Sequence, residues 1–556
     1  MNRKTTKRSF MENVSIILIA QLMIKMLGMI YRMVITNIEG FGDSGNGYYT
    51  AGFQIYTMLL AVSSVGIPNA IAKMVSERAA LNDYRGAHYV FKSALKLFSV
   101  IGLACTALLF FCSDFVAKTV MNMDGAQYTM RALSPSIFFV CVSSVIRGYF
   151  TGLQNMKATS NSQVLEQFFK CGLTILFVVL AIGQPPEIMA AWANLATSVA
   201  TVLSLTYLLI FYRNQKKGIW KQVRGSEKVQ LPPLGKMMKS ILMISIPISL
   251  GSIITAVNRI IDTATITRGI EAAFSAYIPA SAAAAAIINP TLEQLNDEAV
   301  RLAGMLSKSD VLINMPLALN IAFSTVLVPS ISGAMAVGNK KEAAGKVNYS
   351  FLISILLILP CAIGLIALAQ PIYMFIYRNA SQGADLLQFS AIALVFTALN
   401  QTMSGSLQGL GKIYTPATGL LAGCIAKIIL NIVLIRIPSI NIYGAVISSI
   451  VCQLVAFSIS FTVLSGQLSL RLSLGKYVLK PLLAGAVMGV CAYGFYHMGM
   501  QLLHSNILWL MASIVVAVIV YLLMVFLLRI MNADEITMLP FGNKLAAVLK
   551  KRKLLK

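Results

Sequence analysis

The sequence predicts an all-α polytopic membrane protein with about 14 transmembrane helices, in two six-helix lobes related by a parallel repeat plus two C-terminal helices. Three observations lead to this fold class. Of the 556 residues, 57% are hydrophobic and 12% are charged, against about 25% charged in soluble proteins. Apolar runs long enough to cross ~30 Å of hydrocarbon recur along the whole chain. Two distant segments also repeat each other.

The first span follows the basic N-terminal segment MNRKTTKRSF. A secretory signal is the alternative for this region, but the apolar run is longer than the core of a signal peptide and no small-residue cleavage site follows it. The fourteen expected spans are 13–36, 48–70, 90–112, 130–150, 162–183, 188–212, 240–266, 310–330, 349–369, 386–409, 416–436, 442–464, 481–499 and 507–530.

The repeat joins GYFTGLQNMKATSNSQVLEQFFK with GSLQGLGKIYTPATGLLAGCIAK, aligned without gaps. The matching positions are Gly148 with Gly405, Gly152 with Gly409, Leu153 with Leu410 and Lys170 with Lys427. Asn82 and Asn339 are separated by the same offset. Six spans per half give both halves the same orientation, which is a known plan of transporters that work by alternating access.

The repeat and the charge pattern divide the chain into five expected parts. These are an N-terminal six-helix lobe at 1–212, a basic cytoplasmic linker at 213–239, a C-terminal six-helix lobe at 240–465, helices 13 and 14 at 466–530, and a basic cytoplasmic tail at 531–556. With a cytoplasmic N-terminus, most of the 45 Lys and Arg fall on the cytoplasmic side. We therefore predict a multi-pass protein of the cell membrane with both termini in the cytoplasm.

Composition excludes several classes of function. Basic cytoplasmic loops explain the net charge of +25, and no nucleic-acid-binding motif is present. The eight Cys lie in apolar runs without a CxxC pair and the three His are scattered, which argues against a metal site or a disulfide framework. The segment GSLQGLGKI lacks the spacing of a P-loop, so we expect transport to be driven by a gradient rather than by ATP.

Helix 1 carries a polar stripe at helical spacing. Gln21, Lys25, Gly28, Arg32 and Thr36 fall on one narrow face, opposite Ile, Leu and Met. A Lys or Arg at the centre of a bilayer costs at least about 2.5 to 3.5 kcal/mol and indicates a functional site by default. The alternative is that both side chains reach the membrane interfaces, which suits Arg32 better than Lys25.

Other helices supply further candidates. Gln54 lies in a stripe of helix 2 that either lines a hydrated path or makes interhelical hydrogen bonds. Arg259 and Asp262, one turn apart on helix 7, form either a structural ion pair or an ion-linked switch. Asp262 and Asp310, at the start of helix 8, are the candidate groups for Na⁺ or H⁺ coupling. No cofactor is expected, and the membrane potential is an alternative energy source.

Two segments carry a resemblance to a known family: YTMLLAVSSVGIPNAIAKMVSE (56–77) and RGYFTGLQNMKATSNSQVLEQ (147–167). With the fourteen spans, the duplicated lobes and the charged helix 1, they resemble polysaccharide flippases of the MOP superfamily. The greatest similarity is to the group of the lipid II flippase MurJ and stage V sporulation protein B, over nearly the whole chain. The resemblance implies a MATE-like, V-shaped fold and a groove, formed with helices 13 and 14, that holds a lipid tail.

The resemblance also implies a flippase rather than an enzyme, which exports an undecaprenyl-pyrophosphate-linked cell-wall precursor, lipid II or a related glycolipid, by alternating access. Family members have cavity-facing basic residues in helices 1, 2 and 8. Helices 2 and 8 here offer no mid-span basic residue, so Arg259 is the candidate replacement. The expected substrate-binding residues are Lys25, Arg32, Arg259, Gln21 and Gln54. The expected partners are the lipid-linked oligosaccharide, the membrane and proteins of cell-wall synthesis, and no nucleic acid.

Three alternatives stay open. A multidrug exporter of the same fold would couple to a cation through Asp262 or Asp310. A membrane-embedded glycosyl- or phosphotransferase would need acidic or histidine clusters, whereas the chain offers isolated acids. A scaffold without transport leaves the charged stripes unexplained.

Overall fold

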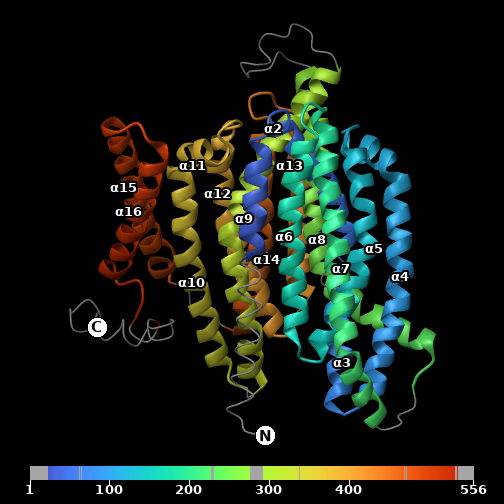
Figure 1. Cartoon of the computed structure of the whole chain (residues 1–556). Helices are drawn as coiled ribbons and strands as arrows, with labels where there is room; N and C mark the ends of the chain where they lie inside the picture. Colours follow the sequence, from blue (N-terminus) through green and yellow to red (C-terminus); the bar gives the residue numbers. More distant parts are fainter. Residues whose placement is uncertain are drawn as a thin grey trace. The chain divides into compact units, whose positions relative to one another are not determined.

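The computed structural model describes residues 23–61, 63, 66–226, 231–275, 292–336, 338–412, 414–468, 470, 473–532 and 535. Within these ranges the chain is almost entirely helical and has no β-strand (Figure 1). It divides into two compact units. Unit 1 comprises Met1–Ser307 with Asn431–Ile442, and unit 2 comprises Lys308–Leu430 with Tyr443–Lys556. The lobe boundaries expected from the repeat are a different division and stay a prediction.

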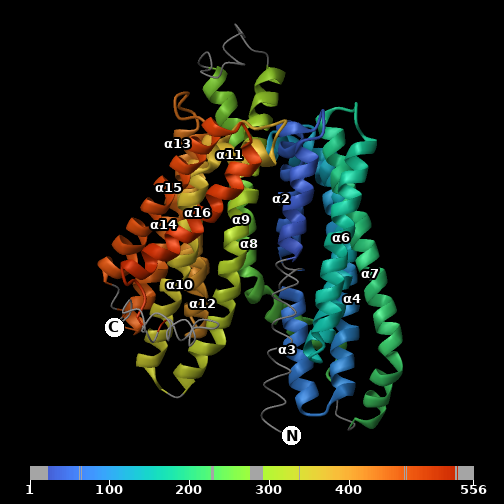
Figure 2. The ribbon, with the colours of Figure 1, turned by 60° about the vertical axis from the view of Figure 1, so that its left-hand side comes forward.

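Unit 1 holds a helix over residues 23–36 and the helices α2 to α8. Their bounds are α2 Gly42–Ala61, α3 Ile67–Ala80, α4 Tyr84–Phe115 with the π-helical η2 Val116–Met121, α5 Ala126–Gly152, α6 Met156–Leu180, α7 Pro186–Gly225 and α8 Leu234–Ser275. The first part of α9, Leu292–Ala336, and the end of α13 also belong to unit 1. α6 packs along α7 (Figure 2), and α5 packs against α3, α4 and α7.

Unit 2 holds the rest of α9 and the C-terminal helices. Their bounds are α10 Lys340–Ala367, α11 Ala369–Ile376, α12 Ala384–Gly409, α13 Tyr414–Leu434, α14 Tyr443–Leu468, η3 Gly475–Leu479, α15 Lys480–Leu502 and α16 Asn506–Leu527. α15 and α16 pack on each other, and α15 packs on α10. Gly489 permits this approach, because a Cβ there would lie 2.7 Å from Cγ2 of Ile363.

The expected helical membrane fold is confirmed, and every expected span overlaps a helix. Among the described residues, ten helices are long and apolar enough to cross a membrane. The segments Leu234–Ile246 and Ser249–Ala273 of α8, bent by 54°, make eleven if they form one span. The number fourteen therefore stays a prediction.

The expected span at 48–70 overlaps α2 and α3, and the described residues between them, 63 and 66, are π-helical. Pro68 lies in the first turn of α3, where a residue without an N–H is tolerated. The span expected at 310–330 is part of α9, which includes the polar segment LEQLNDEAVRL that hydropathy does not detect. Lys308 therefore lies inside this helix, and the absence of a mid-span basic residue from helix 8 stays a prediction.

α7 is longer than a membrane crossing requires. Its 40 residues extend over ~60 Å at 1.5 Å per residue, about twice the hydrocarbon thickness. In its last part, RNQKKGIWKQVRG, the Lys and Arg side chains are exposed, whereas Ile219 is buried. The Trp220 ring packs 5.7 Å from the His88 ring of α4. The first half of the expected basic linker is therefore a helix that packs on unit 1.

The repeated glycines have equivalent packing roles in the two halves. On α5, Gly152 faces α3, where an added Cβ would lie 2.7 Å from Cβ of Val75. On α12, Gly409 faces α9, where an added Cβ would lie 2.9 Å from Cβ of Ile331. Small residues at this spacing let helix backbones approach closely. In each half, the fourth expected span thus packs on the second through the same glycine, as the repeat predicts.

Candidate functional site

Arg32 lies on the helix over residues 23–36, and its side chain is buried inside unit 1, with 8% exposed. Its Nη2 donates hydrogen bonds to Oγ1 of Thr50 on α2 at 3.0 Å and to Oγ of Ser307 on α9 at 2.7 Å. The two hydroxyl groups lie 2.8 Å apart. Arg32 therefore finds its hydrogen-bond partners inside unit 1.

Aromatic rings extend this site to a second buried cation. The guanidinium carbon of Arg32 lies 4.5 Å from the centre of the Tyr49 ring, and the Tyr49 hydroxyl is 3.0 Å from that of Tyr31. Nζ of Lys170, on α6, lies 5.6 Å from the Tyr31 ring centre and 4.3 Å from that of Phe53. We call Arg32, Lys170, Tyr31, Tyr49 and Phe53 the cation–aromatic cluster.

The cation–aromatic cluster holds its two charges without a carboxylate. The ion pairs of the described chain include neither Arg32 nor Lys170. Contacts with aromatic faces are worth about 2 kcal/mol or more each when desolvated, which offsets only part of the several kcal/mol that burying each ion costs. Nη1 of Arg32 is buried and has no hydrogen-bond partner. The cluster therefore favours a negatively charged ligand.

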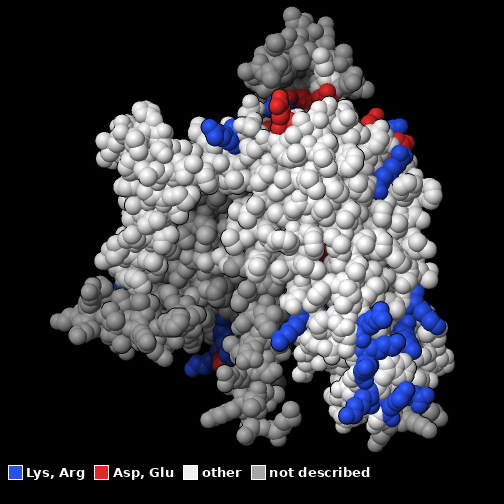
Figure 3. All heavy atoms as spheres, in the orientation of Figure 1, with Lys and Arg blue, Asp and Glu red and all other residues white. Residues whose placement is uncertain are grey.

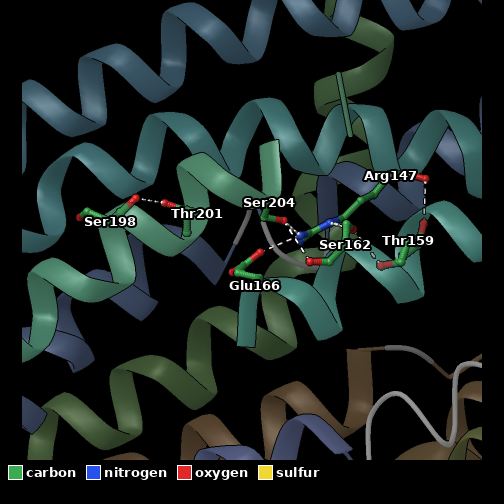
Figure 4. A network of polar contacts seen from close by, with 7 residues as sticks. All are labelled: Arg147, Thr159, Ser162, Glu166, Ser198, Thr201 and Ser204. Atoms are coloured by element: carbon green, nitrogen blue, oxygen red, sulfur yellow. Dashed lines mark hydrogen bonds and ion pairs between the residues drawn. The ribbon is translucent and has the colours of Figure 1, made fainter. Parts of the chain in front are cut away.

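A third buried cation, Arg147 of α5, is neutralised. Its Nη2 lies 2.7 Å from Oε2 of Glu166 on α6 and donates to Oγ of Ser204 on α7 at 2.8 Å. Its Nε donates to Oγ of Ser162 on α6 at 2.9 Å. Figure 4 shows these side chains converging from the three helices. The Arg147 network thus joins α5, α6 and α7 at one level of unit 1.

The cluster and the Arg147 network share a cavity of about 490 Å³ within unit 1. Its walls come from α2, α3, α5, α6 and α7. Residues that line it include Phe53, Thr57, Arg147, Glu166, Gln167 and Lys170. The volume falls within the ~300–1,000 Å³ typical of small-molecule sites.

The other expected cations lie nearby on the surface of unit 1. Lys25 and Arg259 are both exposed, and they lie close enough for their charges to interact. Lys25 and Arg32 thus differ in burial, although the helical stripe places them on one face. Gln21 lies outside the described residues. The substrate-binding role of these residues stays a prediction.

Gln54 and the two candidate coupling acids have other neighbours. Gln54 is half-buried, and its Oε1 accepts a hydrogen bond from Thr263 of α8. Oδ1 of Asp262 accepts a hydrogen bond from Nδ2 of Asn431 at 3.4 Å. Asp310 is exposed and belongs to unit 2. The pairing of Asp262 with Arg259 and a role in ion coupling stay predictions.

Sequence reasoning missed the roles of Lys170, Arg147 and Lys308. The sequence repeat identifies Lys170, because Lys427 occupies the matching position in the second half. Lys427 is also buried, with 1% exposed. Glu166 and Lys170, one turn apart on a largely apolar helix, were a second signal. Lys308 is buried in unit 2 and donates hydrogen bonds to the carbonyls of Ala380 at 2.5 Å and Gln382 at 2.9 Å, which indicates a structural role.

Charge is separated along unit 1. Figure 3 shows Lys and Arg gathered at the end of unit 1 where α3 and α4 meet, while Asp and Glu lie at the opposite end. The basic end includes the exposed side chains of the α7 extension: Arg213, Lys216, Lys217, Lys221 and Arg224. In the described chain, no three His, Cys, Asp or Glu side chains are grouped so that they can hold a metal ion.

Similar proteins are known by sequence. The lipid II flippase MurJ of Bacillus subtilis (strain 168) is 24% identical over 484 residues, covering 84% of this chain and 84% of that protein. Stage V sporulation protein B of the same organism is 22% identical over 550 residues, covering 97% of this chain and 99% of that protein.

Solved structures share the fold. A lipid II flippase MurJ in an inward closed conformation matches with a TM-score of 0.65 at 15% identity, over 91% of this chain and 97% of that chain. An inward-facing multidrug resistance MATE family transporter of the MOP superfamily matches with a TM-score of 0.60 at 16% identity, over 81% of this chain and 98% of that chain. The fold is thus MATE-like.

Family models cover most of the sequence. The model of the lipid II flippase MurJ matches residues 299–513. The model of the polysaccharide biosynthesis proteins matches residues 10–335, more than half of the chain. The chain belongs to the family of polysaccharide biosynthesis proteins.

Proposed function

We propose that the protein is a flippase that exports an undecaprenyl-pyrophosphate-linked cell-wall precursor, lipid II or a related glycolipid, across the cytoplasmic membrane. The observation that carries this proposal is the cation–aromatic cluster, in which Arg32 and Lys170 are buried without a carboxylate partner. Family membership and the named function of the B. subtilis relative support it.

The pyrophosphate is the chemical group that such a cluster fits. Arg binds phosphate oxygens through two parallel N–H donors and Lys binds them as a compact charge. Each hydrogen bond to a charged group is worth about 1.5 to 3 kcal/mol, which offsets part of the loss of headgroup hydration. Nη1 of Arg32 still lacks an acceptor. Because this atom is buried, the ligand reaches it only after a rearrangement, as alternating access requires.

In this proposal, the exposed cations Lys25 and Arg259 are the first to contact the lipid headgroup. They attract the headgroup, and the buried cluster holds it during transport. The basic end of unit 1 faces the cytoplasm in this proposal, because positive residues concentrate on that side of membrane proteins. The polyprenyl tail stays in lipid or in a groove formed with α15 and α16, as the family resemblance implies.

Translocation in proteoliposomes tests the proposal. Vesicles with the wild-type protein should move lipid II between leaflets, whereas the variant Lys25→Ala/Arg32→Ala should not. The control Arg213→Ala/Lys216→Ala removes two exposed charges from the α7 extension and should move the lipid at the wild-type rate. Growth of a flippase-depleted host on the Lys25→Ala/Arg32→Ala variant, at wild-type rate and expression, would refute the assignment.

A cation-coupled multidrug exporter is the second candidate. The half-buried Asp262, hydrogen-bonded by Asn431, favours it as a possible cation ligand. Against it, the cavity of unit 1 has one carboxylate, Glu166, and that group is already paired with Arg147. Drug susceptibility of a deletion strain distinguishes the two: increased susceptibility to cationic drugs with an intact cell wall would favour the exporter.

A further inference from the structure

Lys170 brings an unneutralised positive charge to the cavity of unit 1. Its side chain is 7% exposed, its Nζ lies 4.3 Å from the centre of the Phe53 ring, and it lines the cavity. Aromatic faces compensate only part of the cost of removing an ammonium group from water. An anion in the cavity would supply the missing compensation.

The other charges that line the cavity cancel each other. The guanidinium of Arg147 and the carboxylate of Glu166 form an ion pair at 2.7 Å (Figure 4). With Lys170, two cations oppose one carboxylate, so the lining has one net positive charge. The cavity should therefore prefer an occupant with one negative charge to a neutral occupant of the same shape.

The walls of the cavity suit a sugar. One part is apolar, with Tyr56, Leu60 and Met156, and can contact the C–H groups of a pyranose ring. Another part carries the hydroxyl and amide groups that bond sugar hydroxyls, among them Thr57, Ser144 and Gln167. Sites of this kind combine an apolar surface with a few convergent polar groups. The cavity of about 490 Å³ is large enough for a monosaccharide.

We infer that this cavity binds the sugar part of the transported precursor and selects a sugar that carries one negative charge. The ammonium group of Lys170 recognises this charge. This inference rests on the proposed function and extends it from the pyrophosphate to the sugar. A carboxylate on the sugar ring or a phosphodiester attached to it supplies this single charge, whereas a terminal phosphate carries about 1.5 to 2 negative charges at pH 7.

Calorimetric titration of the full-length protein in nanodiscs tests the inference with soluble probes. Glucuronate and glucose differ only in the carboxylate, so their affinity ratio reports the charge preference directly. We expect glucuronate to bind about tenfold more tightly, the lower end of what one charge-assisted hydrogen bond contributes. Glucose 1-phosphate and inorganic phosphate form the second pair, which separates an acidic sugar from a free anion.

Two variants should change the affinity ratio in opposite directions. Lys170→Gln should reduce the affinity ratio of glucuronate to glucose to about one. The substitution removes the positive charge that strengthens the hydrogen bond to the glucuronate carboxylate. Glu166→Gln should increase the preference above that of the wild type, because Arg147 then adds a second positive charge while Gln still accepts its hydrogen bond. Lys170→Arg should retain the preference. General destabilisation of the cavity would weaken the binding of both sugars in both variants. It would not change the affinity ratio in opposite directions.

Each remaining outcome overturns the inference. These outcomes are equal binding of glucuronate and glucose, binding of neither sugar, a preference that survives Lys170→Gln, or no increase with Glu166→Gln. If inorganic phosphate and glucose 1-phosphate compete equally with glucuronate, the cavity is a site for a free anion only. The proposed function fails separately, if the wild-type protein selects the charged sugar but moves neither lipid II nor an undecaprenyl-pyrophosphate-linked acidic sugar in proteoliposomes.

Discussion

Replacing Arg147 by Met should strongly destabilise unit 1. The side chain is 9% exposed and contacts Glu166 at 2.7 Å, Ser204 at 2.8 Å and Ser162 at 2.9 Å. The substitution removes all three contacts and leaves the Glu166 carboxylate without its counter-ion. Breaking a buried pair in this way costs about 3 to 5 kcal/mol. Since the side chain of Glu166 is 25% exposed, we expect a loss of about 3 kcal/mol, at the lower end of this range.

A double-mutant cycle separates the ion pair from general packing. Arg147→Met/Glu166→Met replaces both partners by apolar side chains and should be more stable than Arg147→Met alone, because no unpaired charge stays buried. Reversible unfolding in SDS, followed by circular dichroism, measures the free energy of each variant. Arg213→Met, an exposed position on α7, is the control and should change stability by less than about 0.5 kcal/mol. A double variant that loses the sum of both single losses would show that the ion pair is not what Arg147 contributes.

Further substitutions test packing, capping and a buried lysine. Gly152→Leu should destabilise the α3–α5 contact, because even a Cβ there would lie 2.7 Å from Cβ of Val75. Gly218→Ala should stabilise α7 by up to about 1 kcal/mol in the same SDS assay, because no atom lies within 4 Å of the added Cβ. Lys308→Met should cost about 1.5 to 3 kcal/mol, because the hydrogen bonds from the buried ammonium group to the carbonyls of Ala380 and Gln382 are lost; unchanged unfolding would contradict this. Asp83→Ala removes the N-terminal cap of α4 and the ion pair of Asp83 with Arg78 at 2.9 Å. The helix should lose about 0.5 to 2 kcal/mol of stability, which should appear as faster amide exchange at the start of α4.

The apolar pattern predicts where helices lie but not where they end. Hydropathy reports contact with lipid, so it identifies the first part of α7 and misses the polar helix that continues to Gly225. For the same reason, the polar start of α9 at Leu292 was not expected. Helix ends that depend on tertiary packing leave no local signal in the sequence.

The candidate site could be predicted only in part. The helical stripe identifies Arg32, because a charge on a uniformly apolar helix must find partners inside the protein. Its partner Ser307 is 275 positions away, and no local pattern connects the two. Lys170 is marked by the repeat, but its environment depends on rings from two other elements, Tyr31 and Phe53. A single sequence shows that a residue is unusual, whereas the fold decides what surrounds it.

The long C-terminal extension of α7 offers a labelling position for topology experiments. Lys217 is exposed on a stretch that exceeds the hydrocarbon thickness, and the helix there is held against α4 by Trp220. The exposed native thiols, Cys112 and Cys491, lie on the apolar helices α4 and α15. A Lys217→Cys thiol should therefore react with a membrane-impermeant maleimide from one side of the vesicle only. That side identifies the compartment into which the basic end of the protein projects.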